Sequence, residues 1–294
     1  MVIAANKVVV GYDTSEESRN AVAWAAIVAN RRQVPLVVLC ATGWVSPPAG
    51  MKGLEVSGEQ LAYRTAEQGA EIAREAVAGL EVEVVGVQNT PLAALTNLSM
   101  EAQLIVVGHR GAGALRMGQL GSVAFGVVHH ANCPVAVIRG EPRELPSEQL
   151  PSVVAVDGSR QSDTALDKAA QWADESQSLL RIVSAWRTPL VHPWSSIAVD
   201  EDNKVNREAS RRAQEAAHDV VDRAEERVRA AYPQLRVEKV TGEGRAPEVI
   251  VDAAKDASLV IIGARGRGDF ASLVLGSVSR EVIEHADCAV YVVR

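Results

Sequence analysis

The chain has 294 residues and a formal net charge of −7, and this length predicts about two domains of roughly 150 residues each. A hydrophobic fraction of 47% and a charged fraction of 23% are ordinary for a globular protein, and no apolar run approaches the ~20 residues of a membrane-spanning helix. The acidic balance argues against nucleic acid as an electrostatic partner, and the first residues carry no secretory signal, so we expect a cytoplasmic protein.

Short apolar strands alternate with helices along the first half of the chain. Ala21 and Ala25 keep a helical spacing after a start rich in Ser and Glu, whereas Val8, Val9 and Val10 form an apolar run. In chain order we predict strands at 7–11, 35–41, 82–87, 104–107 and 134–139, and helices at 15–32, 59–79, 91–102 and 122–131. The second half repeats this order, with strands near 152–156, 179–185, 235–240, 258–262 and 288–293 and a long helix at 203–231. Such alternation predicts an α/β protein whose parallel sheets are covered by helices on both faces.

A glycine-rich segment occurs twice. GHRGAGALRMGQLGS occupies 108–122 and GARGRGDFASLVLGS occupies 263–277, so that Gly108, Gly111, Gly121 and Ser122 each recur at a displacement of 155 residues. The start of each half recurs at a displacement of 144, which makes Asp157 the counterpart of Asp13. The chain is therefore predicted to be a tandem repeat, with a first domain at 1–142, a second at 150–294 and a linker rich in Pro and charge at 140–152.

Both glycine-rich segments lie where a doubly wound sheet binds ligands, outside the carboxyl ends of the strands where the strand order reverses. Each segment ends in Gly-Ser, which we interpret as a helix start with Ser122 or Ser277 as the cap. The free backbone N–H groups and positive dipole end of such a helix suit a phosphate. The alternative is that both segments are strand-to-helix connections whose glycines serve the backbone alone.

Charged residues share this rim. Asp13 and Asp157 end the first strand of each half, and each carboxylate could accept a hydrogen bond from a ribose hydroxyl or could cap the helix that follows. Four arginines in or beside the glycine-rich segments could offset phosphate charge or could simply aid solubility: Arg110, Arg116, Arg265 and Arg267.

Several common motifs are excluded by particular residues. The first segment lacks the Gly-Lys-Ser/Thr ending of a P-loop, and Arg116 breaks the dinucleotide pattern G-x-G-x-x-G/A. The second segment matches that pattern from Gly266 to Ala271, but it follows the fourth strand instead of the first, so we interpret the match as chance. No nucleophile elbow or metal-binding spacing is present, so we predict no catalytic residue and no protein metal ligand.

The spacing G-x2-G-x9-G-[S/T], present twice, resembles the nucleotide-binding signature of the universal stress protein family. The openings VVVGYDTSEESRNAVAWA and VVAVDGSRQSDTALDKAA and the endings VVHHANCPVAVIR and VIEHADCAVYVVR extend the resemblance over nearly the whole chain, which is similar to the tandem members found in actinobacteria. The resemblance implies two α/β domains, each a five-stranded parallel sheet ordered 3-2-1-4-5 and flanked by helices, of the adenine nucleotide alpha hydrolase-like kind. It also implies that the chain binds ATP with Mg²⁺ or Mn²⁺.

The resemblance assigns roles to particular residues. The aspartates would hold the ribose or adenine edge, the alanines that end the second strands would line the adenine pocket, the glycines and serines would wrap ribose and phosphates, and the valines would flank the last helix start. The first site would comprise Asp13, Ala41, Gly108, Gly111, Gly121, Ser122 and Val123, and the second Asp157, Ala185, Gly263, Gly266, Gly276, Ser277, Val278 and Ser279. Ser279 keeps a hydroxyl that Ala124 lacks, so we expect the first site to hold phosphates less well.

Three functions are compatible with these patterns. The first is an ATP-binding regulatory or sensor protein of the stress response, the second a slow ATPase or nucleotide hydrolase using Asp13 or Asp157, and the third an interaction module with vestigial sites. Pairing through the last strands, 135–139 and 289–293, is implied by the family, as is a homodimer of the tandem chain. A protein partner is expected but its identity is not encoded in any motif.

Overall fold

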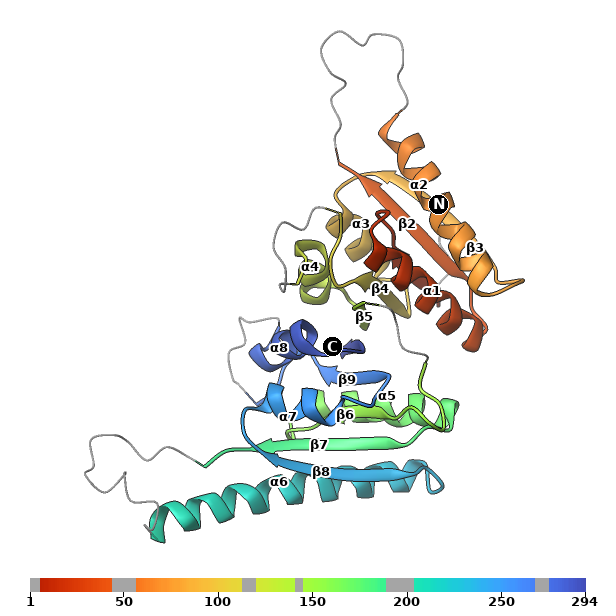
Figure 1. The fold of residues 1–294 in the computed structure, drawn as a ribbon. Helices are drawn as coiled ribbons and strands as arrows, with labels where there is room; N and C mark the ends of the chain where they lie inside the picture. Colours follow the sequence, from red (N-terminus) through yellow and green to blue (C-terminus); the bar gives the residue numbers. More distant parts are fainter. Residues whose placement is uncertain (1–5, 44–56, 113–119, 141–144, 189–203, 268–274) are drawn as a thin grey trace, which may run out of the picture. The chain divides into compact units, whose positions relative to one another are not determined.

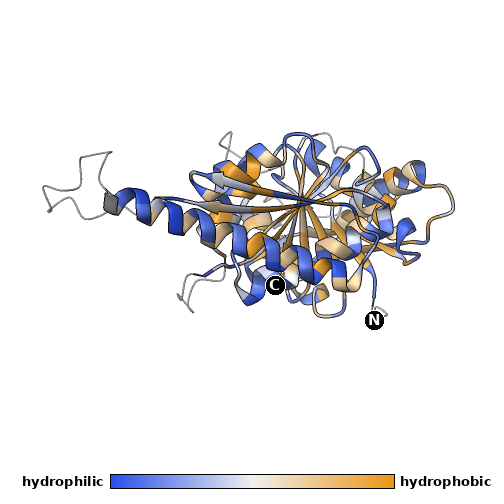
Figure 2. Ribbon diagram, turned by 90° about the horizontal axis from the view of Figure 1, so that it is seen from below, coloured by the Kyte–Doolittle hydropathy of each residue, from blue (hydrophilic) through white to orange (hydrophobic). Residues whose placement is uncertain are grey.

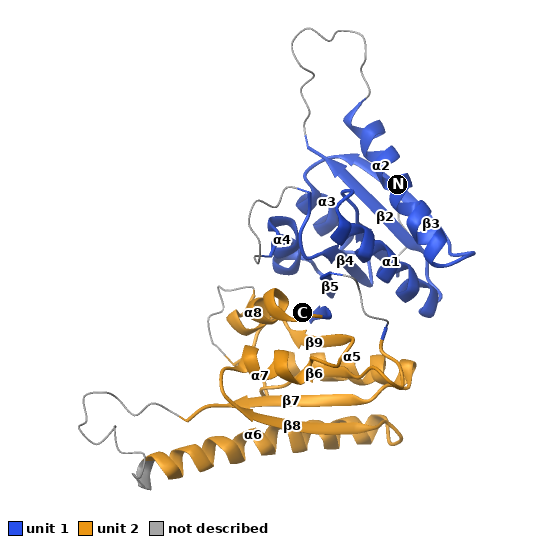
Figure 3. Ribbon diagram, in the orientation of Figure 1, with its two compact units in different colours: residues 1–145, 288–292, 294 blue, residues 146–287, 293 orange. Residues whose placement is uncertain are grey.

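The chain divides into two compact units, shown in blue and orange in Figure 3. A computed structural model describes residues 6–43, 57–112, 120–140, 145–188, 204–267 and 275–294. Unit 1 comprises residues 1–145, 288–292 and 294, and unit 2 comprises residues 146–287 and 293. Arg116 and Ala271, which entered the motif arguments above, lie outside the described residues.

Unit 1 alternates strands and helices as the sequence predicts (Figure 1). Its strands run in the order β3-β2-β1-β4-β5, and every pairing among these five is parallel. This confirms the predicted order 3-2-1-4-5. The elements are β1 (Val8–Gly11), α1 (Glu16–Arg31), β2 (Leu36–Thr42), α2 (Gly58–Ala76), β3 (Val82–Gln88), α3 (Pro91–Leu98), β4 (Leu104–Gly108), α4 (Ser122–His130) and β5 (Val135–Ile138).

The central strand of unit 1 is β1, where the direction of chain winding reverses. Val8 is in register with Leu36 of β2 on one side and with Leu104 of β4 on the other. Since right-handed crossovers place helices on opposite faces when the winding direction changes, α1 packs beside α2 and α3 packs beside α4. The side chains of β1 and β4 are almost fully buried between these two helical layers, which fixes the carboxyl ends of both strands at one rim.

The helix predicted at 91–102 is shorter than expected. It ends at Leu98, so the prediction is wrong for its last four residues. The hydroxyl of Ser99 donates to the carbonyl of Thr96 at 2.6 Å and accepts a hydrogen bond from the N–H of Asn132 at 2.9 Å. A serine that offers the backbone such alternative partners disfavours continuation of a helix.

The last strand of the chain, β10 (Ala289–Val293), contributes residues 289–292 to unit 1. It pairs antiparallel with β5, with Val290 in register with Val137 and Val292 with Val135. This pairing supplies hydrogen-bond partners to the otherwise open edge of β5.

Unit 2 repeats the same order of elements. Its strands run β8-β7-β6-β9, all parallel, which matches the first four strands of the order seen in unit 1. The elements are β6 (Ser152–Ala155), α5 (Arg160–Ser176), β7 (Leu180–Trp186), α6 (Lys204–Ala231), β8 (Val237–Glu243), α7 (Ala246–Ala253), β9 (Leu259–Gly263) and α8 (Ser277–His285).

The long helix α6 has 28 residues and is largely hydrophilic in Figure 2, where the strands are mostly hydrophobic. A narrow stripe that includes Ala217, Val220 and Val228 is buried. Charged residues earlier in the helix, Glu208, Arg211, Arg212 and Glu215, pair with one another at the surface, as expected for a helix with one solvated face. Among the described residues, no helix is both long and apolar enough to cross a membrane.

Candidate functional site

In the described part of each unit, a cavity lies at the carboxyl ends of the strands, beside the point of reversal. The cavity of unit 1 has a volume of about 560 Å³ and that of unit 2 about 320 Å³, both within the range of small-molecule sites. Every site residue named from the sequence lines one of these two cavities. The first cavity is lined by Asp13, Ala41, Gly108, Gly111, Gly121, Ser122 and Val123, and the second by Asp157, Ala185, Gly263, Gly266, Gly276, Ser277, Val278 and Ser279.

Asp13 connects the end of β1 to the glycine-rich segment. Its Oδ1 accepts hydrogen bonds from the N–H and hydroxyl of Ser15, at 3.1 and 2.5 Å, and its Oδ2 accepts one from the N–H of Ala112 at 2.9 Å. The cap of α1 is Ser15, whose Oγ accepts from the N–H of Ser18. The alternative in which Asp13 itself caps the helix is therefore wrong.

Asp157 makes the same connection in unit 2. Its Oδ1 accepts from the N–H of Ser159 and its Oδ2 from the N–H of Arg267, both at 2.9 Å. Ser159 caps α5 by accepting from the N–H of Ser162. Two copies of one arrangement, 144 residues apart at the aspartate, therefore tie the first strand of each repeat to the glycine-rich segment.

Both aspartates titrate below their ordinary range. Burial at the cavity rim would raise the pKa of Asp13, but the hydrogen bonds from Ser15 and Ala112 stabilise the carboxylate and lower the pKa overall. The same balance, with Ser159 and Arg267 as donors, lowers the pKa of Asp157. Each carboxylate is therefore ionised at neutral pH, and it is a poor proton acceptor.

Three of the recurring glycines, Gly108, Gly111 and Gly266, have close neighbours that exclude a side chain. A Cβ atom at Gly111 would lie 2.3 Å from Oδ2 of Asp13, and one at Gly266 would lie 2.4 Å from Oδ2 of Asp157. A Cβ atom at Gly108 would lie 2.9 Å from the carbonyl carbon of Glu17, in the first turn of α1. Close approach of the segment to the aspartate and to α1 is thus one physical reason for these glycines.

The helices that follow the glycine-rich segments are capped by glycine and not by serine, although the predicted start of the first of them at residue 122 is confirmed. Gly121 and Gly276 are the N-caps of α4 and α8, and Ser122 and Ser277 are the first helical residues, so the serine caps predicted from the sequence are wrong. Neither glycine cap supplies a side-chain acceptor to the first turn. The N–H groups of that turn therefore remain available to an anion in the cavity.

The inner part of each cavity is apolar, and the sequence argument named only part of it. Ala41 and Ala185 lie at the ends of β2 and β7, as expected. Leu95 of α3 and Ile250 of α7 also line the cavities and were not predicted, although both are apolar and stand 155 residues apart. Both residues could have been found from the sequence, because an apolar residue recurs there at the same displacement of 155 residues as the glycine-rich segments.

Ser279 has a different partner from the one expected. Its side chain is buried, and its hydroxyl donates to the carbonyl oxygen of Gly263 at 2.8 Å. The hydroxyl proton is thus used to hold the first turn of α8 against the end of β9. The hydroxyl that was expected to favour phosphate binding in the second site instead stabilises the wall of the cavity.

The parallel sheet covered by helices on both faces, with a cavity where the strand order reverses, defines the class of doubly wound α/β domains. A family model described as the universal stress protein family matches residues 5–139 and 152–294. The chain therefore belongs to the universal stress protein family and contains two tandem copies of its domain.

Full-length relatives have the same extent. Universal stress protein Rv2005c of Mycobacterium tuberculosis (strain ATCC 25618 / H37Rv) is 33% identical over 302 residues, covering 98% of this chain and 96% of the relative. Universal stress protein Rv2623 of the same strain is 30% identical over 299 residues, with coverages of 98% and 96%. A crystal structure of a universal stress protein from Archaeoglobus fulgidus DSM 4304 matches with a TM-score of 0.67 and 21% identity over 99% of this chain and 97% of that one, which supports the fold.

Proposed function

We propose that the chain is an ATP-binding regulatory or sensor protein of the stress response, with one nucleotide site in each repeat. The observation that carries the proposal is the duplicated cavity itself. In both repeats one wall is apolar and ends at an alanine, Ala41 or Ala185, and the other presents the uncapped first turn of α4 or α8. An adenine ring fits the first environment and a phosphate chain fits the second.

Binding is favoured over the alternative of hydrolysis by the state of the aspartates. A general base needs a pKa near the working pH and an oxygen free to take a proton. Asp13 and Asp157 have lowered pKa values, and both oxygens of each carboxylate already accept hydrogen bonds. We therefore propose at most weak ATP hydrolysis, and phosphate release well above background that is lost in Asp13→Asn or Asp157→Asn would favour the hydrolase instead.

A divalent cation would enter with the nucleotide. Within the described residues, no group of three or more His, Cys, Asp and Glu side chains is placed to hold a metal ion. We propose that Mg²⁺ or Mn²⁺ is coordinated mainly by phosphate oxygens and water, which is a common mode for Mg²⁺. Ser122 and Ser277, which line the cavities, are the hydroxyl groups available to such an ion.

The third alternative, an interaction module with vestigial sites, can be distinguished from the proposed function by analysis of the small molecules that the purified protein carries. The full chain is purified without added nucleotide, and its small-molecule content is determined by mass spectrometry. ATP is then titrated into the emptied protein by calorimetry in the presence of Mg²⁺. We expect adenine nucleotide in the purified protein and two binding events, whereas an empty protein that binds no ATP would contradict the proposal.

Each site is tested by a substitution at its helix cap. Gly121→Asp and Gly276→Asp place a carboxylate at the first turn of α4 or α8, where it repels phosphate. Each variant should lose one of the two binding events. Gly43→Ala is the matched control, because a Cβ atom there meets nothing within 4 Å. Loss of both events in either single variant would contradict independent sites.

The remaining expectations concern the whole chain. We propose a cytoplasmic protein that forms a homodimer of the tandem chain and binds a protein partner, with domains at 1–142 and 150–294 and a linker at 140–152. Light scattering after size-exclusion chromatography measures the mass in solution, and a mass of one chain would contradict the dimer. Limited proteolysis should cleave first within the linker.

A further inference from the structure

The described walls of the two cavities differ by one cationic side chain. Arg265 lines the second cavity and its counterpart, Arg110, lines the first. Arg267 also lines the second cavity, but the residue at the equivalent position of the first repeat is Ala112. The two sites therefore present different charge to a ligand although they share their fold.

The backbone at this position is the same in both repeats. The N–H of Arg267 donates to Asp157 and the N–H of Ala112 donates to Asp13, each at 2.9 Å. The side chain of residue 267 therefore starts from a backbone position that is the same in both repeats, and at this position the two sites differ in the side chain.

A second residue leaves room for the guanidinium group. A Cβ atom at Gly158 would lie 3.1 Å from Nη2 of Arg267 and 3.4 Å from Cγ2 of Val220 in α6. The counterpart of Gly158 in the first repeat is Thr14, and both residues have a positive φ, +78° and +70°. The second repeat thus combines Gly158 with Arg267. At the equivalent positions the first repeat has the branched residue Thr14 and Ala112.

The charge of Arg267 is not used within the described part of the chain, where its guanidinium forms no ion pair. Arg245 pairs with Glu281 and Arg280 pairs with Glu284 in the same unit. An arginine that lines a cavity and forms no ion pair with a described carboxylate is suited to bind an anion.

We propose that Arg267 is a specificity-determining residue of the second site, where its guanidinium group binds the phosphate chain and favours nucleotides with more phosphates. Gly158 keeps the space that the guanidinium occupies. The first site, with Ala112 at the equivalent position, discriminates less between ATP and adenosine. This inference rests on the proposed nucleotide function and names the group that sets the preference within it.

The test measures phosphate preference in the full chain. ATP, AMP and adenosine are titrated into the Gly121→Asp protein, in which the second site alone remains, with and without Arg267→Ala. We expect Arg267→Ala to weaken ATP binding about tenfold, because the phosphate chain loses its contact with the guanidinium. Adenosine binding should stay unchanged within about twofold, because adenosine has no phosphate group for the arginine to bind. The ATP affinity of the Arg267→Lys variant should lie between that of the parent protein and that of Arg267→Ala, since an ammonium group is a single point charge.

Two further variants test the geometry. Gly158→Ala should also weaken ATP more than adenosine, because the added Cβ displaces the guanidinium. Its adenosine affinity reports whether the site still folds. Thr14→Gly is the matched control, because it alters only the equivalent position of the first repeat. Introducing Ala112→Arg together with Thr14→Gly into the Gly276→Asp protein should transfer the preference for ATP to the first site.

The outcomes separate the inference from the function on which it rests. Wild-type protein that binds neither ATP nor adenosine overturns the proposed function and the inference together. Wild-type protein that binds ATP, with Arg267→Ala binding it equally well, overturns the inference alone. Equal loss of ATP and adenosine in Arg267→Ala also overturns it, because the arginine would then support the site without reading phosphate.

Discussion

The carboxylate of Asp13 accepts a hydrogen bond of 2.9 Å from the backbone N–H of Ala112, which lies 99 residues further along the chain. The carboxylate of Asp157 holds the N–H of Arg267 in the same way over 110 residues. The duplication shows that the aspartate and the glycine-rich segment form one structural unit. Its glycines, its ionised state and its neighbours each lead to a measurable expectation.

Substitution of Gly111 by Ala should disrupt this unit. The new Cβ would lie 2.3 Å from Oδ2 of Asp13, so the hydrogen bond to Ala112 must break or the segment must move. We expect a loss of about 1.5–3 kcal/mol in the free energy of unfolding, the range for a lost hydrogen bond to a charged group. Chemical denaturation measures this value. Gly43→Ala, which meets no atom within 4 Å, should change stability little, and an equal effect in both variants would contradict the clash.

The contribution of Asp13 should depend on pH. Its pKa is lowered in the folded protein from an ordinary value of 3.8, so its stabilising effect is present above that value and is lost as the pH falls through the lower folded pKa. Asp13→Asn should therefore destabilise the protein at neutral pH, and the difference from wild type should shrink below about pH 4. Denaturation curves between about pH 7 and pH 3 test this. A constant difference over the whole range would show that the charge is irrelevant.

Thr14 has a φ of +70°, a conformation that costs energy for a branched residue. We expect Thr14→Gly to stabilise the protein by about 0.5–1 kcal/mol, because relief of the strain exceeds the entropy that glycine adds to the unfolded chain. Thermal unfolding measures the change. Gly158, at the equivalent position of the second repeat, shows that glycine is compatible with this backbone. A lower melting temperature for Thr14→Gly would contradict the strain.

Arg181 should contribute strongly to the stability of unit 2. Its guanidinium donates to Glu238 at 2.7 Å, to the carbonyl of Ala253 at 2.6 Å and to Asp256 at 2.6 and 3.1 Å, and its side chain is only 14% exposed. These carboxylates raise the pKa of Arg181 further above its ordinary value. Arg181→Ala should lower the free energy of unfolding by about 2–3 kcal/mol, because several acceptors lose their donor at once.

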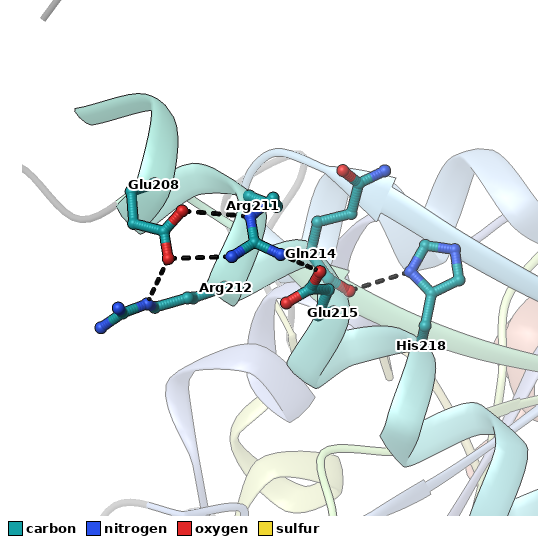
Figure 4. Close-up of polar contacts among 6 residues, drawn as sticks. All are labelled: Glu208, Arg211, Arg212, Gln214, Glu215 and His218. Carbon is teal, nitrogen blue, oxygen red and sulfur yellow. Dashed lines mark hydrogen bonds and ion pairs between the residues drawn. The ribbon is translucent and has the colours of Figure 1, made fainter. Parts of the chain in front are cut away.

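The matched control for Arg181 lies on α6. Arg211 pairs with Glu208 and Glu215, and Arg212 also pairs with Glu208 (Figure 4), but these side chains are well exposed. The two arginines lower the pKa of Glu208 to about 2. Because exposed pairs gain little net stability in water, Arg211→Ala should not change the denaturation midpoint measurably. A large effect there, or none for Arg181→Ala, would reverse the expected order.

Much of the fold follows from local patterns. The alternation of apolar runs with helical spacings predicts the strands and helices to within a few residues, and the repeated displacement predicts the duplication. The helix predicted at 91–102 is the instructive exception, because its end depends on Ser99 bonding to Asn132, which is distant in sequence. The predicted serine caps are wrong for a different reason, since the periodicity does not tell whether the residue at a helix boundary is the cap or the first helical residue.

The sequence by itself determined which residues stand at the rim of each sheet, because the end of a strand and the recurrence of glycines can be read along the chain. Only the tertiary structure decided what those residues do there. It joined Asp13 to Ala112, gave the hydroxyl of Ser279 to Gly263, and placed Gly158 against Arg267. Each of these contacts joins separate segments of the chain, and their partners are set by the packing of whole strands and helices, which local propensity does not specify.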